Sequence, residues 1–310
     1  MRIVLTGGTG ALGRAALPSL LAAGHDVLAV VRTTRSARIA QALGAATTRG
    51  DVLDLDGLAT AYAGADAVVN LATHVPVGHD AFVPGAWRRH DQLRTTGVGH
   101  VVEAARRAGV RRVVQESVSF LYAEQGEEWI TEESPVEITR MTEPAAVGEA
   151  HVQDYAGSSR VGVVLRFGTV IGNDGQTRYW LRAAEHGRRI GLGHPADWSH
   201  VVHTDDVGSA VVAALHAPSG VYNVGAEPVQ RQELVQGYAD AVGVEVKPFA
   251  GPVARWWMGP RFEAPARSLR VCSDHFAAQT GWRRVRPKFD VGWFEVARHP
   301  AVAQLHDLHR

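Results

Sequence analysis

The sequence predicts an α/β protein built on a doubly wound parallel sheet, and three observations lead to this fold class. Short β-branched runs alternate with amphipathic helical stretches up to about residue 170. These runs are too apolar to have one solvated face, which indicates strands buried on both sides. A glycine-rich turn joins the first run to the first helical stretch. Strands that alternate with helices form βαβ units, and their right-handed crossovers generate a parallel sheet.

The expected elements follow the chain in order. Buried strands are expected at residues 3–5, 27–31, 67–71, 110–114 and 162–166, with helices at 11–23, 36–43, 55–62 and 92–108. Beyond residue 172 the pattern loosens, with helices expected at 177–186, 206–216 and 231–242 and a strand at 221–224. We therefore expect a sheet domain over residues 1–172, to which the chain returns at about 201–226, and a smaller interleaved lobe over residues 173–310.

The composition excludes several classes of function. The 32 basic residues balance the 32 acidic residues, so no net charge favours nucleic acid or an anionic membrane. Cys272 is the sole cysteine, which excludes an intramolecular disulfide and a multi-cysteine metal site, and we expect no metal. The chain has neither an apolar leader nor an apolar run of about 18 residues. We expect a cytoplasmic protein with a small-molecule substrate, and a homodimer is a further expectation.

The glycine-rich turn carries the strongest functional signal. It contains Gly7, Gly10 and Gly13, a GxxGxxG spacing between the first expected strand and the first expected helix. Glycine permits a tight turn and a close approach of the backbone to a pyrophosphate, while the helix N-terminus faces the negative charge. The turn therefore predicts a Rossmann-type dinucleotide site.

Further motifs occur in a regular order along the chain. They include Gly50-Asp51-Val52, Asn70-Leu71-Ala72, Ser117 with Leu121-Tyr122, Leu165-Arg166, His203-Thr204-Asp205-Asp206, Tyr222-Asn223-Val224-Gly225 and Gly281-Trp282. Together they resemble the extended short-chain dehydrogenase/reductase family, in its nucleotide-sugar epimerase/dehydratase branch. The resemblance implies a Rossmann domain with a small substrate lobe. It also implies phosphate contacts from Thr9, Ala11 and Leu12, adenine contacts from Asp51 and Val52, and ribose contacts from Leu71, Ala72 and Thr73.

The residues after the second expected strand indicate NADP (NADPH) as the cofactor. An NAD-selective site places a carboxylate there to accept hydrogen bonds from the ribose. In this chain Val31 holds that position, and Arg32 and Arg35 follow it. A guanidinium suits a 2′-phosphate, although a solvated basic loop is the other interpretation.

The residues that transfer the proton in this family are missing here. Family members use a Tyr-x-x-x-Lys pair with a Ser or Thr, in which the lysine also holds the nicotinamide ribose. The chain has only two lysines, Lys247 and Lys288, and neither follows a tyrosine at that spacing. Alignment on Glu149 puts Met141 at the tyrosine and Ala145 at the lysine. Counting back four residues from Tyr122 puts Val118 at the hydroxyl position, with Ser117 and Ser119 on either side.

Other polar groups near this position could still donate a proton. We expect Ser119, Tyr122 and Ser117 to be the catalytic candidates, with Glu116 as an unusual carboxyl after a buried strand. Arg94 replaces the family's usual asparagine. Candidate substrate residues are arginines that could bind a sugar diphosphate and apolar side chains that could form a flat-walled pocket: Arg178, Arg182, Arg188, Arg189, Arg267, Arg270, Trp180, Trp198, Trp256, Trp257 and Met258.

Three functional hypotheses remain open at this point. The first is an atypical NADP(H)-dependent oxidoreductase acting on a small, apolar or aromatic molecule without the conventional relay. The second is a redox-neutral epimerase, isomerase or lyase on the same scaffold. The third is a non-catalytic sensor that binds NADP.

Overall fold

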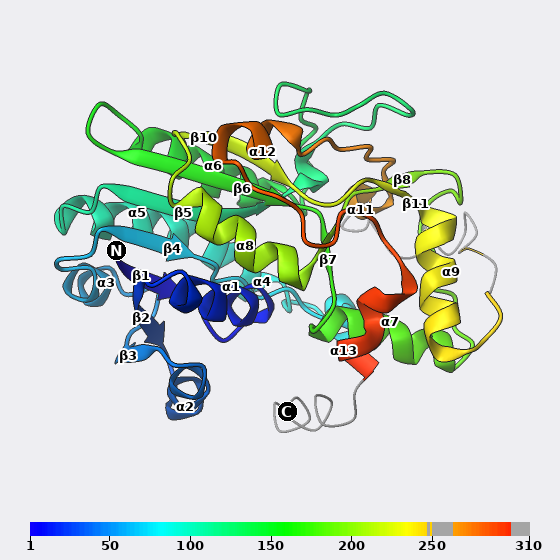
Figure 1. Cartoon of the computed structure of the whole chain (residues 1–310), viewed down its shortest axis with the longest axis horizontal. Helices are drawn as coiled ribbons and strands as arrows, with labels where there is room; N and C mark the ends of the chain where they lie inside the picture. The colour runs from blue at the N-terminus through cyan, green and yellow to red at the C-terminus, as the bar shows by residue number, and fades with distance from the viewer. Residues whose placement is uncertain (247–248, 250–262, 299–310) are drawn as a thin grey trace.

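Seven parallel strands form the central sheet, in the order β10-β6-β5-β4-β1-β2-β3 (Figure 1). The computed structural model describes residues 1–246, 249 and 263–298. The strands are β1 (Arg2–Thr6), β2 (Asp26–Val31), β3 (Ala46–Arg49), β4 (Ala67–Asn70), β5 (Arg112–Val118), β6 (Val161–Phe167) and β10 (Gly220–Val224). This order confirms the doubly wound fold, because it reverses direction between β1 and β4.

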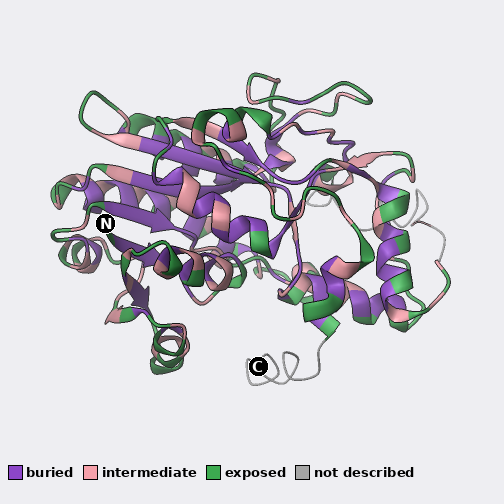
Figure 2. Cartoon of the chain, in the orientation of Figure 1, coloured by how far each residue is buried: buried purple, intermediate pink, exposed green. Residues whose placement is uncertain are grey.

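Helices cover both faces of the sheet. One face carries α1 (Ala11–Ala22), α2 (Thr34–Ala42), α8 (Thr204–Ala214) and α12 (Asp274–Thr280). The other face carries α3 (Leu55–Ala61), α5 (Val98–Arg107) and α6 (Glu143–Tyr155). Figure 2 shows the buried residues concentrated along the strands between these layers. Strands enclosed in this way need apolar side chains on both faces, which is the pattern the sequence displays.

A smaller group of elements packs beside the carboxyl ends of the strands. It comprises β7 (Thr169–Ile171) paired with β9 (Val201–His203), β8 (Trp198–Ser199) paired with β11 (Val229–Gln230), α7 (Gly175–Glu185), α9 (Arg231–Val242), η5 (Val291–Phe294) and α13 (Glu295–Arg298). Tyr238, Trp293 and Phe294 contribute to its core. The chain leaves this group to add β10 to the edge of the main sheet beside β6, so the two parts are interleaved. The boundary at residue 172 stays a prediction.

Two of the expected elements differ substantially from the structure, and β3 and α6 were not among the expected elements. The strand expected at 110–114 lies at Arg112–Val118, because Gln115, Glu116 and Ser117 continue the pairing with β6 despite their polarity. The helix expected at 92–108 is three segments: α4 (Arg88–Gln92), a π-helical turn η2 (Leu93–Gly97) and α5. Such π turns recur at functional sites. None of the described helices is both long and apolar enough to cross a membrane.

Candidate active site

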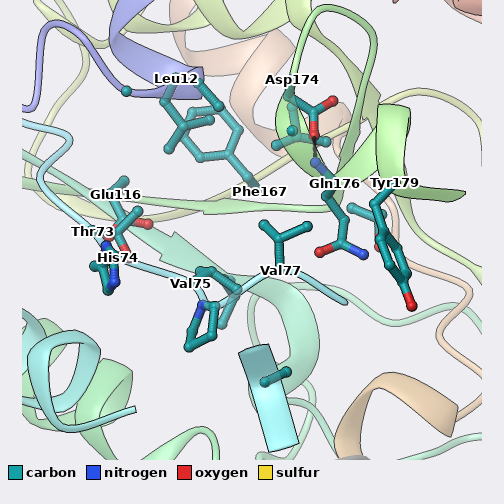
Figure 3. Close-up of a pocket in the computed structure, with 18 of the residues that line it drawn as sticks. Leu12, Thr73, His74, Val75, Val77, Glu116, Phe167, Asp174, Gln176 and Tyr179 are labelled. Atoms are coloured by element: carbon teal, nitrogen blue, oxygen red, sulfur yellow. Dashed lines mark hydrogen bonds between the residues drawn. The ribbon is translucent and has the colours of Figure 1, made fainter. Parts of the chain in front are cut away.

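A cavity of about 710 Å³ opens at the carboxyl ends of the central strands. It lies where the strand order reverses, with the loop after β1 and the loop after β4 among its walls. Open α/β sheets bind their ligands at this point. Figure 3 shows Thr73 and Glu116 on one side of the cavity and Asp174, Gln176 and Tyr179 on the other, where α7 begins.

The glycine turn forms a cradle with no room for side chains on the protein side. Gly7 has φ +74°, and a Cβ there would lie 2.4 Å from the Leu71 carbonyl carbon. A Cβ on Gly13 would lie 2.2 Å from the Gly7 carbonyl oxygen, so this glycine lets α1 pack on the turn. Gly10 is the N-cap of α1, and a Cβ there would meet only the Gly7 oxygen, at 3.4 Å. A dinucleotide pyrophosphate fits this arrangement, since the open side of Gly10 and the helix N-terminus both border the cavity.

The structure brings most of the predicted cofactor residues together around the cavity. Those that line it are Gly7, Thr9, Gly10, Ala11, Leu12, Arg32, Asp51, Val52, Leu71, Ala72 and Thr73. Gly13 and Arg35 are outside the lining: Gly13 packs α1 against the turn, and Arg35 is exposed on α2. Contact of each residue with a cofactor stays a prediction.

The walls near β2 and β3 are polar and charged. Val31 and Arg32 border the cavity at the end of β2, and no carboxylate stands at that strand end. The Asp51 carboxylate accepts two hydrogen bonds from Arg89, at 2.9 and 3.1 Å. Partial burial acts to raise the pKa of Asp51, but the Leu53 N–H and the Arg89 guanidinium hold that pKa below its usual value.

One part of the cavity, which we call the β5 end, is lined by Thr73, Arg94, Glu116, Ser117 and Met141. Arg94, on the π-helical turn, donates a 2.7 Å hydrogen bond to Glu116 Oε2, and both side chains are almost fully buried. Burial raises the pKa of Glu116, and the Arg94 guanidinium partly offsets that rise. Glu116 Oε1 and Arg94 Nε have no hydrogen-bond partner among the described residues.

The three predicted catalytic hydroxyls occupy different surroundings. Ser117 lines the cavity, but its hydroxyl donates a 2.6 Å hydrogen bond to Glu149. Ser119 is fully buried outside the lining, and its hydroxyl has no hydrogen-bond partner among the described residues. Tyr122 also lies outside the lining, and its hydroxyl donates to Asn223 at 2.8 Å. Burial raises the pKa of Tyr122, which makes it a weaker acid. The catalytic roles of all three stay predictions, and the geometry favours Ser117 over the other two.

The positions that the sequence alignment predicts for the proton relay carry apolar side chains. Met141 and Val118 line the cavity beside Glu116 and Ser117, so the tyrosine position faces the ligand space with a thioether. Ala145 is buried in the first turn of α6 and does not line the cavity. Lys288 is exposed on the protein surface, with Glu227 at 3.5 Å, and Lys247 lies outside the described residues.

The end of the cavity away from the glycine turn, which we call the far end, is mainly apolar. Its walls include Val75, Pro76, Val77, Phe82, Phe120, Phe167, Val170, Tyr179, Trp180, Ile190, Leu192, Leu234 and Tyr238. Of the tryptophans considered from the sequence, Trp180 lines the cavity and Trp198 does not. Trp256, Trp257 and Met258 lie outside the described residues. The lining residues within 74–82 were not predicted from the sequence. The apolar Val75-Pro76-Val77 run, a few residues after β4, could have indicated them.

The arginines expected to hold a diphosphate do not line the cavity. Arg178, Arg182, Arg188, Arg189, Arg267 and Arg270 are all absent from its described walls. Arg231 is the lining arginine at the far end, and it bonds to Asp197 and to the Ala266 and Arg267 carbonyl oxygens at 2.6 to 2.9 Å.

Comparisons with known proteins point to one family. The model of the NAD dependent epimerase/dehydratase family matches residues 3–225. The chain is 30% identical over 309 residues to a 3-diazoavenalumate denitrifying reductase from a Streptomyces species, covering 94% of this chain and 99% of that protein. A structure of human epimerase family protein SDR39U1 with NADPH has a TM-score of 0.80 at 22% identity, covering 96% of this chain and 100% of that chain. MoeE5 in complex with UDP-glucose and NAD has a TM-score of 0.75 at 19% identity, covering 98% and 99%.

Proposed function

This chain belongs to the NAD-dependent epimerase/dehydratase family, and from that premise we propose that it is an NADPH-dependent reductase of a small, largely apolar aromatic molecule. The reductases and epimerases among its relatives support an enzyme of oxidoreductase or epimerase type with a nicotinamide cofactor. When bound, NADPH would supply a hydride. The glycine turn, Arg32 and the strand ends from β1 to β5 would hold it.

The preference for NADPH rests on the end of β2. Val31 offers no acceptor for the ribose hydroxyls, and Arg32 borders the cavity with a guanidinium that suits a phosphate dianion. The human relative was crystallised with NADPH, whereas other structural relatives were crystallised with NAD. The residues at this strand end therefore favour NADPH in this chain.

The substrate class rests on one observation: the far end of the cavity is apolar, and the one arginine that lines it among the described residues, Arg231, already bonds to other protein groups. A nucleotide sugar carries a diphosphate, which requires free cationic donors. Arg231 already donates to a carboxylate and to two backbone carbonyls, so it is committed to holding the small lobe together. Aromatic and aliphatic walls instead favour a planar apolar molecule.

The absent proton relay also bears on the reaction. With Met141 and Ala145 at the relay positions, this chain suits a reduction that needs no tyrosine acid. The name of the Streptomyces relative describes a reduction that removes nitrogen from a diazo compound. Replacement of an aryl diazonium group by hydride releases N₂ and consumes no proton. Such a reaction therefore needs no proton donor at the positions of Met141 and Ala145.

A substrate panel tests this function. NADPH oxidation would be followed with aryl diazonium ions, aromatic ketones and UDP-sugars under matched conditions, with product analysis by mass spectrometry. We expect turnover with an aromatic compound and none with UDP-sugars. Conversion of a UDP-sugar without net NADPH oxidation would establish the redox-neutral alternative instead. NADPH binding without turnover across the panel would favour the sensor hypothesis. The homodimer stays a prediction.

A further inference from the structure

We infer that Glu116, held by Arg94, binds the hydroxyls of the cofactor's nicotinamide ribose and so takes over the positioning task for which the cavity has no lysine. This inference rests on the proposed use of NADPH but not on the identity of the substrate. It makes Glu116 a cofactor-binding residue rather than a proton donor.

The first support is a pair of unsatisfied polar atoms at one place. Thr73 Oγ1 and Glu116 Oε1 are buried, have no hydrogen-bond partner among the described residues, and belong to side chains that line the cavity. Burying such an atom unpaired costs about 1–3 kcal/mol, and native proteins rarely leave it so without a ligand or water. A carboxylate oxygen can only accept when ionised, so its partner must be a donor such as a hydroxyl.

The second support is position. Asn70, the last residue of β4, pairs with Gln115 of β5, so Thr73 after β4 and Glu116 within β5 both lie near the carboxyl ends of neighbouring strands (Figure 3). A dinucleotide lies across the strand-order reversal, with one nucleotide over each half of the sheet. With the adenosine phosphate at Arg32 and the pyrophosphate at the glycine turn, the second ribose falls beyond β1, over the ends of β4 and β5.

The third support is the way Glu116 is held. Arg94 bonds to Oε2 alone, which fixes the carboxylate while Oε1 stays available. The π-helical turn carries Arg94 close to α6, where a Cβ on Gly148 would lie 2.7 Å from the Arg94 carbonyl oxygen. A carboxylate fixed by a buried counter-ion is preorganised to accept charge-assisted hydrogen bonds from ribose hydroxyls. Among the described residues, no lysine lines the cavity to compete for that ribose.

Calorimetric titration with three nucleotides tests the assignment. NADP⁺ contains the whole cofactor, and 2′-phospho-ADP-ribose lacks only the nicotinamide ring. 2′,5′-ADP lacks the nicotinamide, its ribose and the phosphate attached to that ribose. A charged hydrogen bond is worth about 1.5–3 kcal/mol. In Glu116→Gln we therefore expect roughly ten- to 150-fold weaker binding of NADP⁺ and 2′-phospho-ADP-ribose. Binding of 2′,5′-ADP should stay within about twofold.

Two variants serve as controls. Arg32→Ala should weaken all three nucleotides, because the 2′-phosphate is common to them. Glu103→Gln changes a partly exposed glutamate of α5 that pairs with Arg107 and does not line the cavity, so it should leave all three affinities near wild type. Thr73→Val removes the second unsatisfied atom while preserving side-chain shape. It should weaken NADP⁺ and 2′-phospho-ADP-ribose but not 2′,5′-ADP, with a smaller loss than Glu116→Gln. If Glu116→Gln does not fold, Thr73→Val still tests the assignment.

Each other outcome overturns a distinct claim. Equal losses for all three nucleotides, or no loss for NADP⁺, would refute the ribose contact. A loss confined to NADP⁺ would assign Glu116 to the nicotinamide ring instead. Unchanged binding with a lower kcat and a shifted pH profile would make Glu116 the proton donor. If wild-type protein binds none of the nucleotides, both proposals fail. Absent turnover with intact differential binding refutes the reductase alone.

Discussion

Two buried arginine–glutamate pairs lie on the β5–β6 side of the sheet, and they differ in what else their atoms contact. Arg166 donates two hydrogen bonds to Glu149, at 2.9 and 2.6 Å, and Ser117 donates a third to the same carboxylate. The Arg166 guanidinium also stacks over the Tyr122 ring, 4.7 Å from its centroid. Arg94 donates a single bond to Glu116, and each of these two residues keeps an unpartnered atom among the described residues.

The difference separates a structural role from a binding role. Neither Arg166 nor Glu149 lines the cavity, and every carboxylate oxygen of Glu149 has a partner, so this pair joins α6 to β6. Arg94 and Glu116 line the cavity and remain incompletely satisfied, which is costly unless a ligand completes their hydrogen bonds. The same two residue types thus act differently because their environments differ.

The largest effect is expected when the satisfied pair is broken. Glu149→Gln leaves the Arg166 charge buried without a counter-ion, and breaking such a pair costs about 3–5 kcal/mol. Urea denaturation would measure this loss of unfolding free energy. Glu116→Gln also leaves a buried guanidinium, that of Arg94, without a counter-ion, but Glu116 accepts one hydrogen bond where Glu149 accepts three, so it should cost less than Glu149→Gln. If Glu116→Gln proves the more destabilising of the two, the structural role belongs to Arg94 and Glu116 instead.

The next effect concerns the far side of the cofactor site. Arg32→Ala should reduce NADPH affinity by about ten- to 150-fold, the worth of a charged hydrogen bond to the 2′-phosphate. NADH affinity should hardly change, since NADH lacks that phosphate. Calorimetry with both cofactors on the wild type and the variant measures the selectivity. Tighter binding of NADH than NADPH by the wild-type protein would contradict the assignment of Arg32.

The glycine turn allows the same separation of structure from binding. Gly10→Val places a side chain where the protein leaves space, so folding should persist while crowding at the pyrophosphate costs about 1–3 kcal/mol of affinity. Gly13→Val is the matched control. Its Cβ meets the Gly7 oxygen at 2.2 Å, so thermal unfolding should show a lower Tm. Wild-type nucleotide affinity in a folded Gly10→Val protein would mean that the turn does not hold the pyrophosphate.

The smallest effect is expected from Tyr122→Phe. The Tyr122 hydroxyl contacts Asn223 rather than the cavity, so turnover should change only slightly. Loss of that bond should cost about 0.5–1.5 kcal/mol of unfolding free energy. Steady-state kinetics and denaturation on the same preparation distinguish the two readouts. A fall in turnover of about 10²–10⁴, the usual worth of a positioned general acid, would restore Tyr122 as the proton donor.

The sequence by itself determined the α/β fold and the glycine cradle, and it predicts the loss of the tyrosine–lysine relay. These features depend on local patterns: apolar runs, a glycine spacing, and the absence of lysine from all but two positions. Such patterns can be recognised in the sequence because each one depends only on residues that are close together along the chain. The sequence pattern predicted too short a β5, because polar residues continue the strand. These residues belong to the sheet because they pair with the neighbouring strands, mainly β6.

Only the tertiary structure decided which polar groups face the cavity. Arg94 and Glu116 are 22 residues apart, and their pairing requires the π-helical turn to pack against the end of β5. Tyr122 faces Asn223, 101 residues away, and Arg231 is engaged by carbonyls 35 and 36 residues further along the chain. Side-chain direction and hydrogen-bond satisfaction at such separations depend on how the elements pack, which no local residue pattern encodes.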